Sequence, residues 1–109
     1  MLHYNQIFAG SAEVSSCQTV LTGGIIPAFT PLMIDPTTGV SLPWDGVNPQ
    51  QAVFLTPCEI DATTTKTVQV YRSGIFNIDV VNWPESVTML TQKLSAFAGS
   101  GIAVQPLAG

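Results

Sequence analysis

Closely spaced prolines constrain the fold of this chain more than any other feature. Between residues 27 and 57 they recur six times: Pro27, Pro31, Pro36, Pro43, Pro49 and Pro57. Each proline ring fixes φ, removes a backbone donor and pushes the preceding residue towards extended geometry. No long helix can cross this region. The sequence therefore predicts short strands and turns throughout the first half.

Two apolar segments are predicted as strands. Residues 52–56 (AVFLT) are too uniformly apolar for a half-exposed strand, so we expect this segment inside a sheet with both faces covered, ending at Pro57. Residues 102–104 (IAV) form a short apolar segment near the C-terminal end and are predicted as a last strand.

Turns are indicated at residues 35–39 (DPTTG) and at Asp45-Gly46, where Asp can cap backbone N–H groups and Gly can adopt positive φ. Residues 67–81 predict a β-hairpin. A three-residue loop at 72–74 pairs Val70 with Phe76 and leaves one apolar and one polar face, which favours this register.

One helix is predicted over residues 84–98. Pro84 suits a first helical position, and Gly99 ends the pattern. The apolar residues in between recur at helical spacing: Val87, Leu90, Leu94 and Phe97. The predicted class is a β-rich α+β domain with many loops.

The first 24 residues carry one charge, Glu13, and end in a glycine pair. This composition predicts an extended, flexible N-terminal arm over residues 1–24, followed by a single β-rich domain over residues 25–109. The arm holds two small apolar anchors, Ile7-Phe8 and Val20-Leu21.

Charged residues are scarce. They make up 9% of the 109 residues, three basic and seven acidic, against roughly 25% in an average soluble domain. Either neighbouring subunits cover much of the surface, or hydroxyls and amides keep the chain soluble. The three basic residues are scattered singly, so we expect no nucleic-acid binding.

Other classes are disfavoured as well. No apolar run approaches the length of a membrane span, which is roughly 18 residues, and the first residues lack the basic start of a signal peptide. We therefore expect a soluble protein made in a cytosol. Cys17 and Cys58 match no zinc or redox spacing and are expected to be free thiols.

No catalytic or metal-binding constellation can be assembled. His3 is the only histidine and lies in an expected mobile end, which is a poor place for a catalytic base. Asp35 and Asp45 are expected to cap turns, and Asp61 is expected to be a turn cap or solvated. We expect no enzyme activity, no cofactor, no metal and no small-molecule substrate. Trp44 is expected in the core or in a subunit contact.

Five motifs in one order resemble the head decoration proteins of lambda-like tailed bacteriophages. They are residues 30–35 (TPLMID), 44–46 (WDG), 71–76 (YRSGIF), 83–85 (WPE) and 96–99 (AFAG). The resemblance covers roughly residues 27–104.

The resemblance implies a structural virion protein with a β-clip-like fold. It implies a homotrimer that binds the major capsid protein on the outer surface of the expanded icosahedral head, at three-fold and quasi-three-fold positions. There it would stabilise the head against the pressure of packaged DNA. It also implies an N-terminal arm that orders on the shell by strand addition. For this chain the expected arm contacts are Ile7, Phe8, Val20 and Leu21.

The alternative from another class is a small glycan- or receptor-binding module of a virion surface, with Trp44 and Tyr71 holding the glycan. Under the decoration hypothesis, the ten charges should gather on the outward face and loop tips, leaving the subunit and shell contacts nearly bare.

Overall fold

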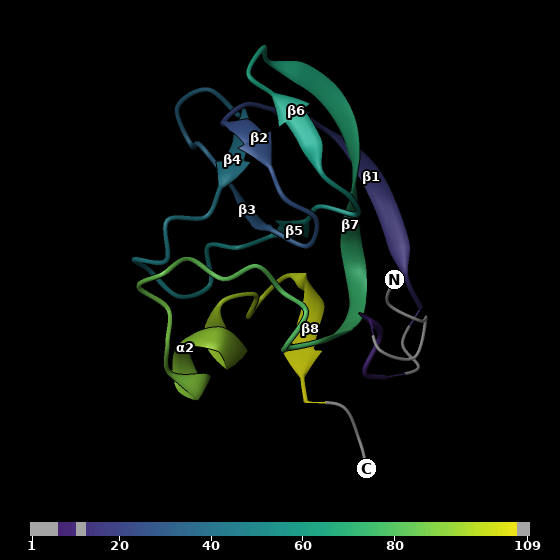
Figure 1. Cartoon of the computed structure of the whole chain (residues 1–109), viewed down its shortest axis with the longest axis vertical. Coiled ribbons are helices and arrows are strands. Elements are labelled where there is room, and N and C mark those ends of the chain that lie inside the picture. The colour runs from purple at the N-terminus through teal and green to yellow at the C-terminus, as the bar shows by residue number, and fades with distance from the viewer. Residues whose placement is uncertain (1–6, 11–12, 107–109) are drawn as a thin grey trace.

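The proline-rich half of the chain folds into short strands, as predicted (Figure 1). The computed structural model describes residues 7–10 and 13–106. Its elements, in chain order, are β1 (Ser15–Leu21), β2 (Gly24–Ile26), β3 (Pro31–Ile34), β4 (Ser41–Pro43), β5 (Phe54–Leu55), β6 (Ile60–Ala62), β7 (Lys66–Asn77), α2 (Leu90–Ser95) and β8 (Gly101–Gln105). The predicted β-rich class is confirmed.

Five strands close into a ring, so the expected β-clip is corrected to a small barrel. The hydrogen-bonded order is β1-β4-β3-β5-β7, and β1 pairs with β7 to complete the circle, while β8 extends the sheet beyond β7. Two joins rest on a single residue pair each: Leu55↔Tyr71 between β5 and β7, and Leu21↔Ser41, in parallel, between β1 and β4. A hydrogen bond of 2.6 Å between the Thr19 and Ser41 hydroxyls supports the join of β1 with β4.

The barrel interior holds one hydrophobic core. Its buried members come from β1, β2, β3, β6 and β7: Leu21, Ile26, Leu32, Ile60, Ala62 and Val70. The two-stranded sheet of β2 and β6 therefore contributes to the same core as the barrel, and Figure 1 shows it at the upper end of the molecule.

Residues 15–21 form a packed strand, so the expectation of an unpacked arm is wrong for this stretch. β1 pairs with β7 in antiparallel register from Ser15↔Ser73 to Leu21↔Lys66, with a β-bulge between Ser15 and Ser16. Exposure alternates along the strand and ends with Leu21 at 0%. Ser16 and Gln18 at exposed positions alternate with half-buried Cys17 and Thr19, which is the pattern of a half-buried strand and is not revealed by a low charge count alone. Residues 1–6, 11 and 12 of the predicted arm lie outside the described residues.

β7 is one continuous strand, which overturns the predicted hairpin. Gly74, with φ +134°, lies within it and allows a change of partner instead of a reversal. The strand pairs with β1 up to Ser73 and in parallel with β8 from Ser73 onward. Val70 and Phe76 are both buried but belong to different cores, so matching their faces gave a false register.

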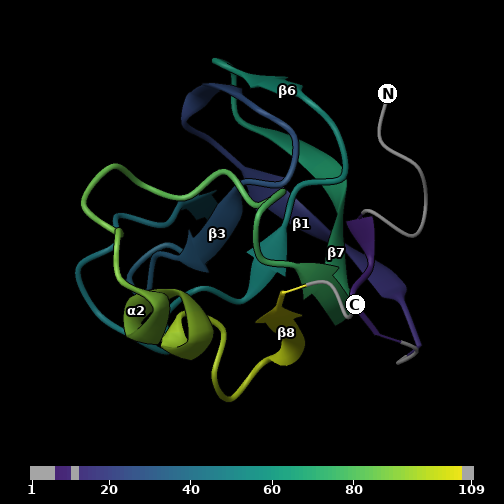
Figure 2. The same cartoon turned by 60° about the horizontal axis from the view of Figure 1, so that its bottom comes forward.

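A second core lies between β8, the C-terminal part of β7 and the segments around α2 (Figure 2). It contains eleven buried residues: Trp44, Ala52, Leu55, Phe76, Ile78, Val81, Val87, Ala96, Phe97, Ile102 and Val104. Trp83 joins it from the side, with its indole N–H donating to the Ile78 carbonyl at 2.9 Å.

The helix is much shorter than the predicted span of 84–98. It covers only Leu90–Ser95, because the Gln92 side-chain oxygen accepts hydrogen bonds from the Thr88 and Met89 N–H groups at 3.1 and 2.9 Å. These bonds cap the helix at Met89, and the chain before it forms turns.

The helical spacing of apolar residues was misleading. Val87 and Phe97 are buried, but both lie outside the helix. Leu90 and Leu94, which lie within the helix, are 56% and 48% exposed. β-Branched Val87 and Thr88 disfavour helix at the predicted start.

Several smaller predictions are confirmed. Residues 102–104 lie within β8. The 52–56 segment lies inside the sheet between β3 and β7, as expected, but only Phe54–Leu55 form the strand β5. Val53 and Phe54 are half-buried, so the expected cover on both faces is only partial. Asp35 and Asp45 cap their turns by accepting the Thr37 and Val47 N–H groups at 2.8 and 2.9 Å. Both cysteines are free thiols, one half-buried and one exposed.

Candidate functional site

A short segment before β1 lies along the edge of β7. This segment, residues 7–10, is called the N-terminal strap. Ala9 N–H donates to the Ile75 carbonyl at 3.0 Å, and Phe8 forms a β-bridge with Phe76. The Gln105 side chain donates to the Ala9 carbonyl at 2.8 Å, which ties the strap to β8. The strap and β1 thus lie beside successive parts of β7: β1 pairs with β7 up to Ser73, and the strap contacts it at Ile75 and Phe76.

The aromatic ring of Phe8 fixes the strap in place. Its centroid lies 5.2 Å from that of Phe76 and 6.3 Å from that of Tyr71. Ile7 and Phe8 are therefore half-buried against the second core. These two predicted arm contacts have surface left to offer a partner, but they already have contacts within the chain.

The other two predicted contacts differ sharply. Val20 is 41% exposed on the outer side of β1, whereas Leu21 is 0% exposed inside the barrel. Because neighbouring residues of a strand point to opposite faces, an adjacent apolar pair cannot present both side chains to a partner. Leu21 is a core residue and has no free surface.

The outer face of β1 and β7 is exposed and carries no charge. We call it the uncharged ribbon; its exposed residues are Ser16, Gln18 and Val20 of β1 with Thr67 and Gln69 of β7. Gln18 pairs with Gln69, and Val20 with Thr67, so these side chains share one face. Lys66 and Arg72 lie just beyond its two ends on β7. Such a face can lose water at lower cost than a charged one.

Beside one end of the uncharged ribbon, β1 and β7 border an open hollow of about 610 Å³. The Ser15 hydroxyl and the Ser73 hydroxyl are hydrogen-bonded on its wall at 2.5 Å. Glu13 and Arg72 also line it, and the Arg72 guanidinium donates to the Ser15 hydroxyl at 3.3 Å.

The ten charged residues all lie in the described part of the chain, and six of them stand outside the strands and α2: Glu13, Asp35, Asp45, Glu59, Asp79 and Glu85. The remaining four are Asp61, Lys66, Arg72 and Lys93. No charge occurs within Ser15–Leu21, so β1 is the longest charge-free element at the surface.

Three of the carboxylates, those of Asp35, Asp45 and Asp61, stabilise local turns. Asp61 accepts hydrogen bonds from the Thr63 hydroxyl at 2.7 Å and the Thr63 N–H at 3.1 Å. These two bonds, with a smaller contribution from Lys66, hold the pKa of Asp61 below its ordinary value. Within residues 7–10 and 13–106, no three His, Cys, Asp or Glu side chains gather as a metal-binding group. His3 lies outside the described residues.

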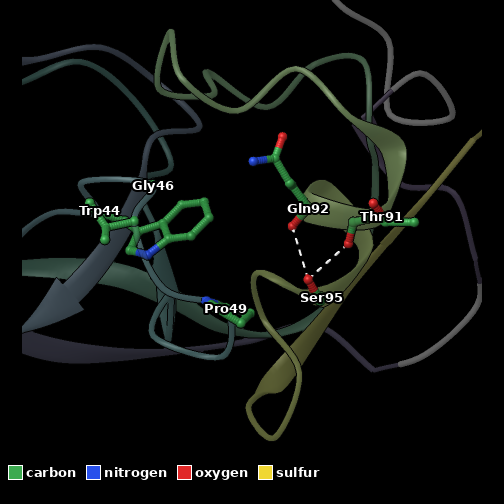
Figure 3. Close-up of a pocket in the computed structure, with 7 residues that line it drawn as sticks. Trp44, Gly46, Pro49, Thr91, Gln92 and Ser95 are labelled. Atoms are coloured by element: carbon green, nitrogen blue, oxygen red, sulfur yellow. Dashed lines mark hydrogen bonds between the residues drawn. The ribbon is translucent and has the colours of Figure 1, made fainter.

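Trp44 borders a small pocket between the 45–50 loop and α2 (Figure 3). The Trp44 ring is only 4% exposed, and its N–H donates to the Asn48 carbonyl at 3.1 Å. Tyr71 does not line this pocket and packs instead against Phe8 and Phe76. The two aromatic residues of the glycan alternative thus do not meet in one site. The expectation of Trp44 as a core residue is confirmed.

None of the described helices has the length and apolar character needed to cross a bilayer.

The described residues form a small, charge-poor β-barrel with an uncharged strand face and no metal-binding group. Comparison with known families places it more closely: residues 6–104 match the family described as bacteriophage lambda head decoration protein D, and the chain belongs to this family. The predicted resemblance is confirmed. It is a family of structural decoration proteins and not of enzymes.

Two relatives illustrate the similarity. The chain is 40% identical over 77 residues to the head decoration protein of Enterobacteria phage P21, a match covering 71% of this chain and 65% of that protein. It is 38% identical over 78 residues to the putative decoration protein of Escherichia phage N15, covering 72% and 70%. The match to the P21 protein thus spans slightly less than two thirds of its length.

Proposed function

We propose that this chain binds the outer surface of the expanded icosahedral phage head as a homotrimer, at three-fold and quasi-three-fold positions. There it contacts the major capsid protein and stabilises the shell against the pressure of packaged DNA. It is made in the host bacterial cytoplasm and acts without a cofactor, nucleic acid or small-molecule substrate. Family membership over residues 6–104 is the observation that carries the proposal.

The uncharged ribbon is the proposed shell-facing surface. It offers amide and hydroxyl groups and one exposed valine, Val20, without any charge that would have to be desolvated. The N-terminal strap continues this surface along β7, so Ile7, Phe8 and Val20 remain proposed contacts. Leu21 is omitted because it is buried.

We keep the proposal that residues 1–24 bind the capsid and that residues 25–109 form the decoration domain. The boundary between them separates two roles and not two structural units. β1 belongs structurally to the barrel. The strap and the ribbon act as one contact on each subunit, and three subunits present three such contacts. Linked contacts bind at high effective concentration, so three weak ones can give a stable attachment.

Head expansion can control this attachment. A trimer engages three sites only where their spacing matches its own, so sites that reach this spacing on expansion bind far more tightly than the unexpanded shell. The unexpanded shell then retains at most a single weak contact.

The test is co-sedimentation of the full chain with expanded and unexpanded heads. Val20→Asp places a charge within the uncharged ribbon and should abolish binding to expanded heads. Ile25→Asp is the matched control, because Ile25 is 64% exposed on β2, outside the ribbon. Binding by Val20→Asp equal to that of the wild type would show that the ribbon does not face the shell. If the wild-type chain does not co-sediment with expanded heads, the proposed function itself is overturned.

A further inference from the structure

Helix α2 exposes apolar side chains that neither core covers. Leu90 and Leu94, one helical turn apart, are 56% and 48% exposed, and the preceding Met89 is 61% exposed. None of the helix residues is buried. A helix in a small domain ordinarily buries its apolar side chains, so a surface pair of leucines indicates a contact with another molecule. Leu90 and Leu94 are called the leucine knob.

The same helix borders a hollow on its neighbouring face (Figure 3). The hollow has a volume of about 270 Å³ and is walled on its other side by Trp44, Val47 and Pro49. It is called the Trp44 hollow. Val47 is 71% exposed, so an apolar wall faces solvent there.

Two polar groups of α2 at the Trp44 hollow, the Ser95 hydroxyl and the Gln92 side-chain oxygen, are already engaged. The Ser95 hydroxyl donates to the Thr91 carbonyl at 2.8 Å, and the Gln92 side-chain oxygen accepts the two capping N–H groups. An incoming group therefore needs few hydrogen bonds of its own. An enclosed apolar cavity of about 150 Å³ can hold a benzene ring, so a hollow of about 270 Å³ has room for aliphatic side chains.

We propose that the occupant is a second copy of this chain: the leucine knob of one copy seats in the Trp44 hollow of the next. One chain carries both the protruding and the receiving part, side by side on one helix, which is what a head-to-tail contact requires. Such contacts close into a ring when the rotation between copies permits. The inference rests on the proposed function, which gives the number of copies as three. It adds which surfaces of neighbouring copies meet.

Charges around the two parts are complementary. Lys93, the basic residue of α2, adjoins the knob residue Leu94. Asp45 adjoins Gly46, which lines the Trp44 hollow. The residue next to the knob and the residue next to the hollow lining thus carry opposite charges. The knob and the hollow lining are themselves uncharged, so the contact avoids the repulsion expected between chains of net charge −4.

The location also suits the proposed assembly. In both cartoon views α2 lies at the lower left, whereas the N-terminal strap lies at the right (Figures 1 and 2). A contact between copies through α2 therefore leaves the strap free for the shell.

Native mass spectrometry of the full chain, with sedimentation velocity, tests the contact by complementation. Leu90→Gln with Leu94→Gln removes the knob and keeps the hollow. Val47→Trp, at an exposed position on the wall opposite α2, fills the hollow and keeps the knob. Each variant alone should be monomeric where the wild type is trimeric. An equimolar mixture should form a one-to-one heterodimer, because one intact knob meets one intact hollow. Ile25→Gln is the control and should stay trimeric.

Folding of each variant is checked by circular dichroism and thermal unfolding, since all the changed side chains are exposed. Two variants that remain trimeric, or a mixture without heterodimer, would overturn the contact and leave the decoration function standing. A monomeric wild type at concentrations that saturate expanded heads would overturn both the contact and the trimer.

Discussion

Phe8 and Phe76 face each other across a single antiparallel bridge, with ring centroids 5.2 Å apart. This pair joins the N-terminal strap to the second core, so the strap is part of the folded domain.

Phe8→Ala should release the strap from β7. Because Phe8 is half-buried, the loss of apolar contact and ring packing should lower the free energy of unfolding by about 1–2 kcal/mol. Hydrogen exchange of the Ala9 amide, which donates to the Ile75 carbonyl, should accelerate. Unchanged protection of the Ala9 amide would show that the ring does not hold the strap.

Gly74 should tolerate no side chain. At its φ of +134° a Cβ would be strained and would meet the Phe76 ring at 3.1 Å and Val14 at 3.2 Å. Gly74→Ala should therefore destabilise the fold by about 2 kcal/mol or more in denaturant unfolding. Gly39 has φ +76° with open space around it, so Gly39→Ala should cost only about 1 kcal/mol. Equal effects would contradict the role of Gly74 where β7 changes partners.

Replacing Leu21 should destabilise the fold far more than replacing its neighbour Val20. Leu21→Ala opens a cavity in the barrel core and should cost about 2–5 kcal/mol in chemical denaturation. Val20→Ala changes an exposed side chain and should stay within about 0.5 kcal/mol of the wild type. A larger stability loss for Val20→Ala than for Leu21→Ala would contradict the observed direction of the two side chains.

Asp61 should titrate below its ordinary pKa. Its pKa is lowered mainly by the two Thr63 hydrogen bonds, so Thr63→Ala should raise it in an NMR titration. A carboxyl with a depressed folded pKa contributes stability above its unfolded pKa and loses it as the pH falls through the folded pKa. The small contribution of this exposed group should thus disappear only under acidic conditions. An Asp61 that titrates at its ordinary pKa in the wild type would contradict the effect of these bonds.

The sequence predicted turns and the positions of short strands better than it predicted which strands pair with each other. Proline spacing, the aspartate turn caps and the strand at 102–104 depend on neighbours in the chain, and all three are observed. The partners of a strand depend on the whole barrel. Gly74 fits a hairpin loop as well as it fits a kink within a strand, and only the partners on either side distinguish the two.

The candidate site was predictable in part. The family motifs identified the class, and the composition indicated charge-free surfaces. Which residues form them was missed, because the uncharged ribbon is made by two strands about 50 residues apart, as Gln18 and Gln69 show. The exposure of Leu90 and Leu94 was missed because a helical apolar pattern does not reveal whether its partner is the same chain.

The most direct test of the proposed function is an electron-microscopy map of expanded heads saturated with this chain. The proposal predicts three copies at each three-fold and quasi-three-fold position on the outside, with the uncharged ribbon against the shell. Heads that carry no added density at these positions, or copies whose β1 faces outward, would contradict it.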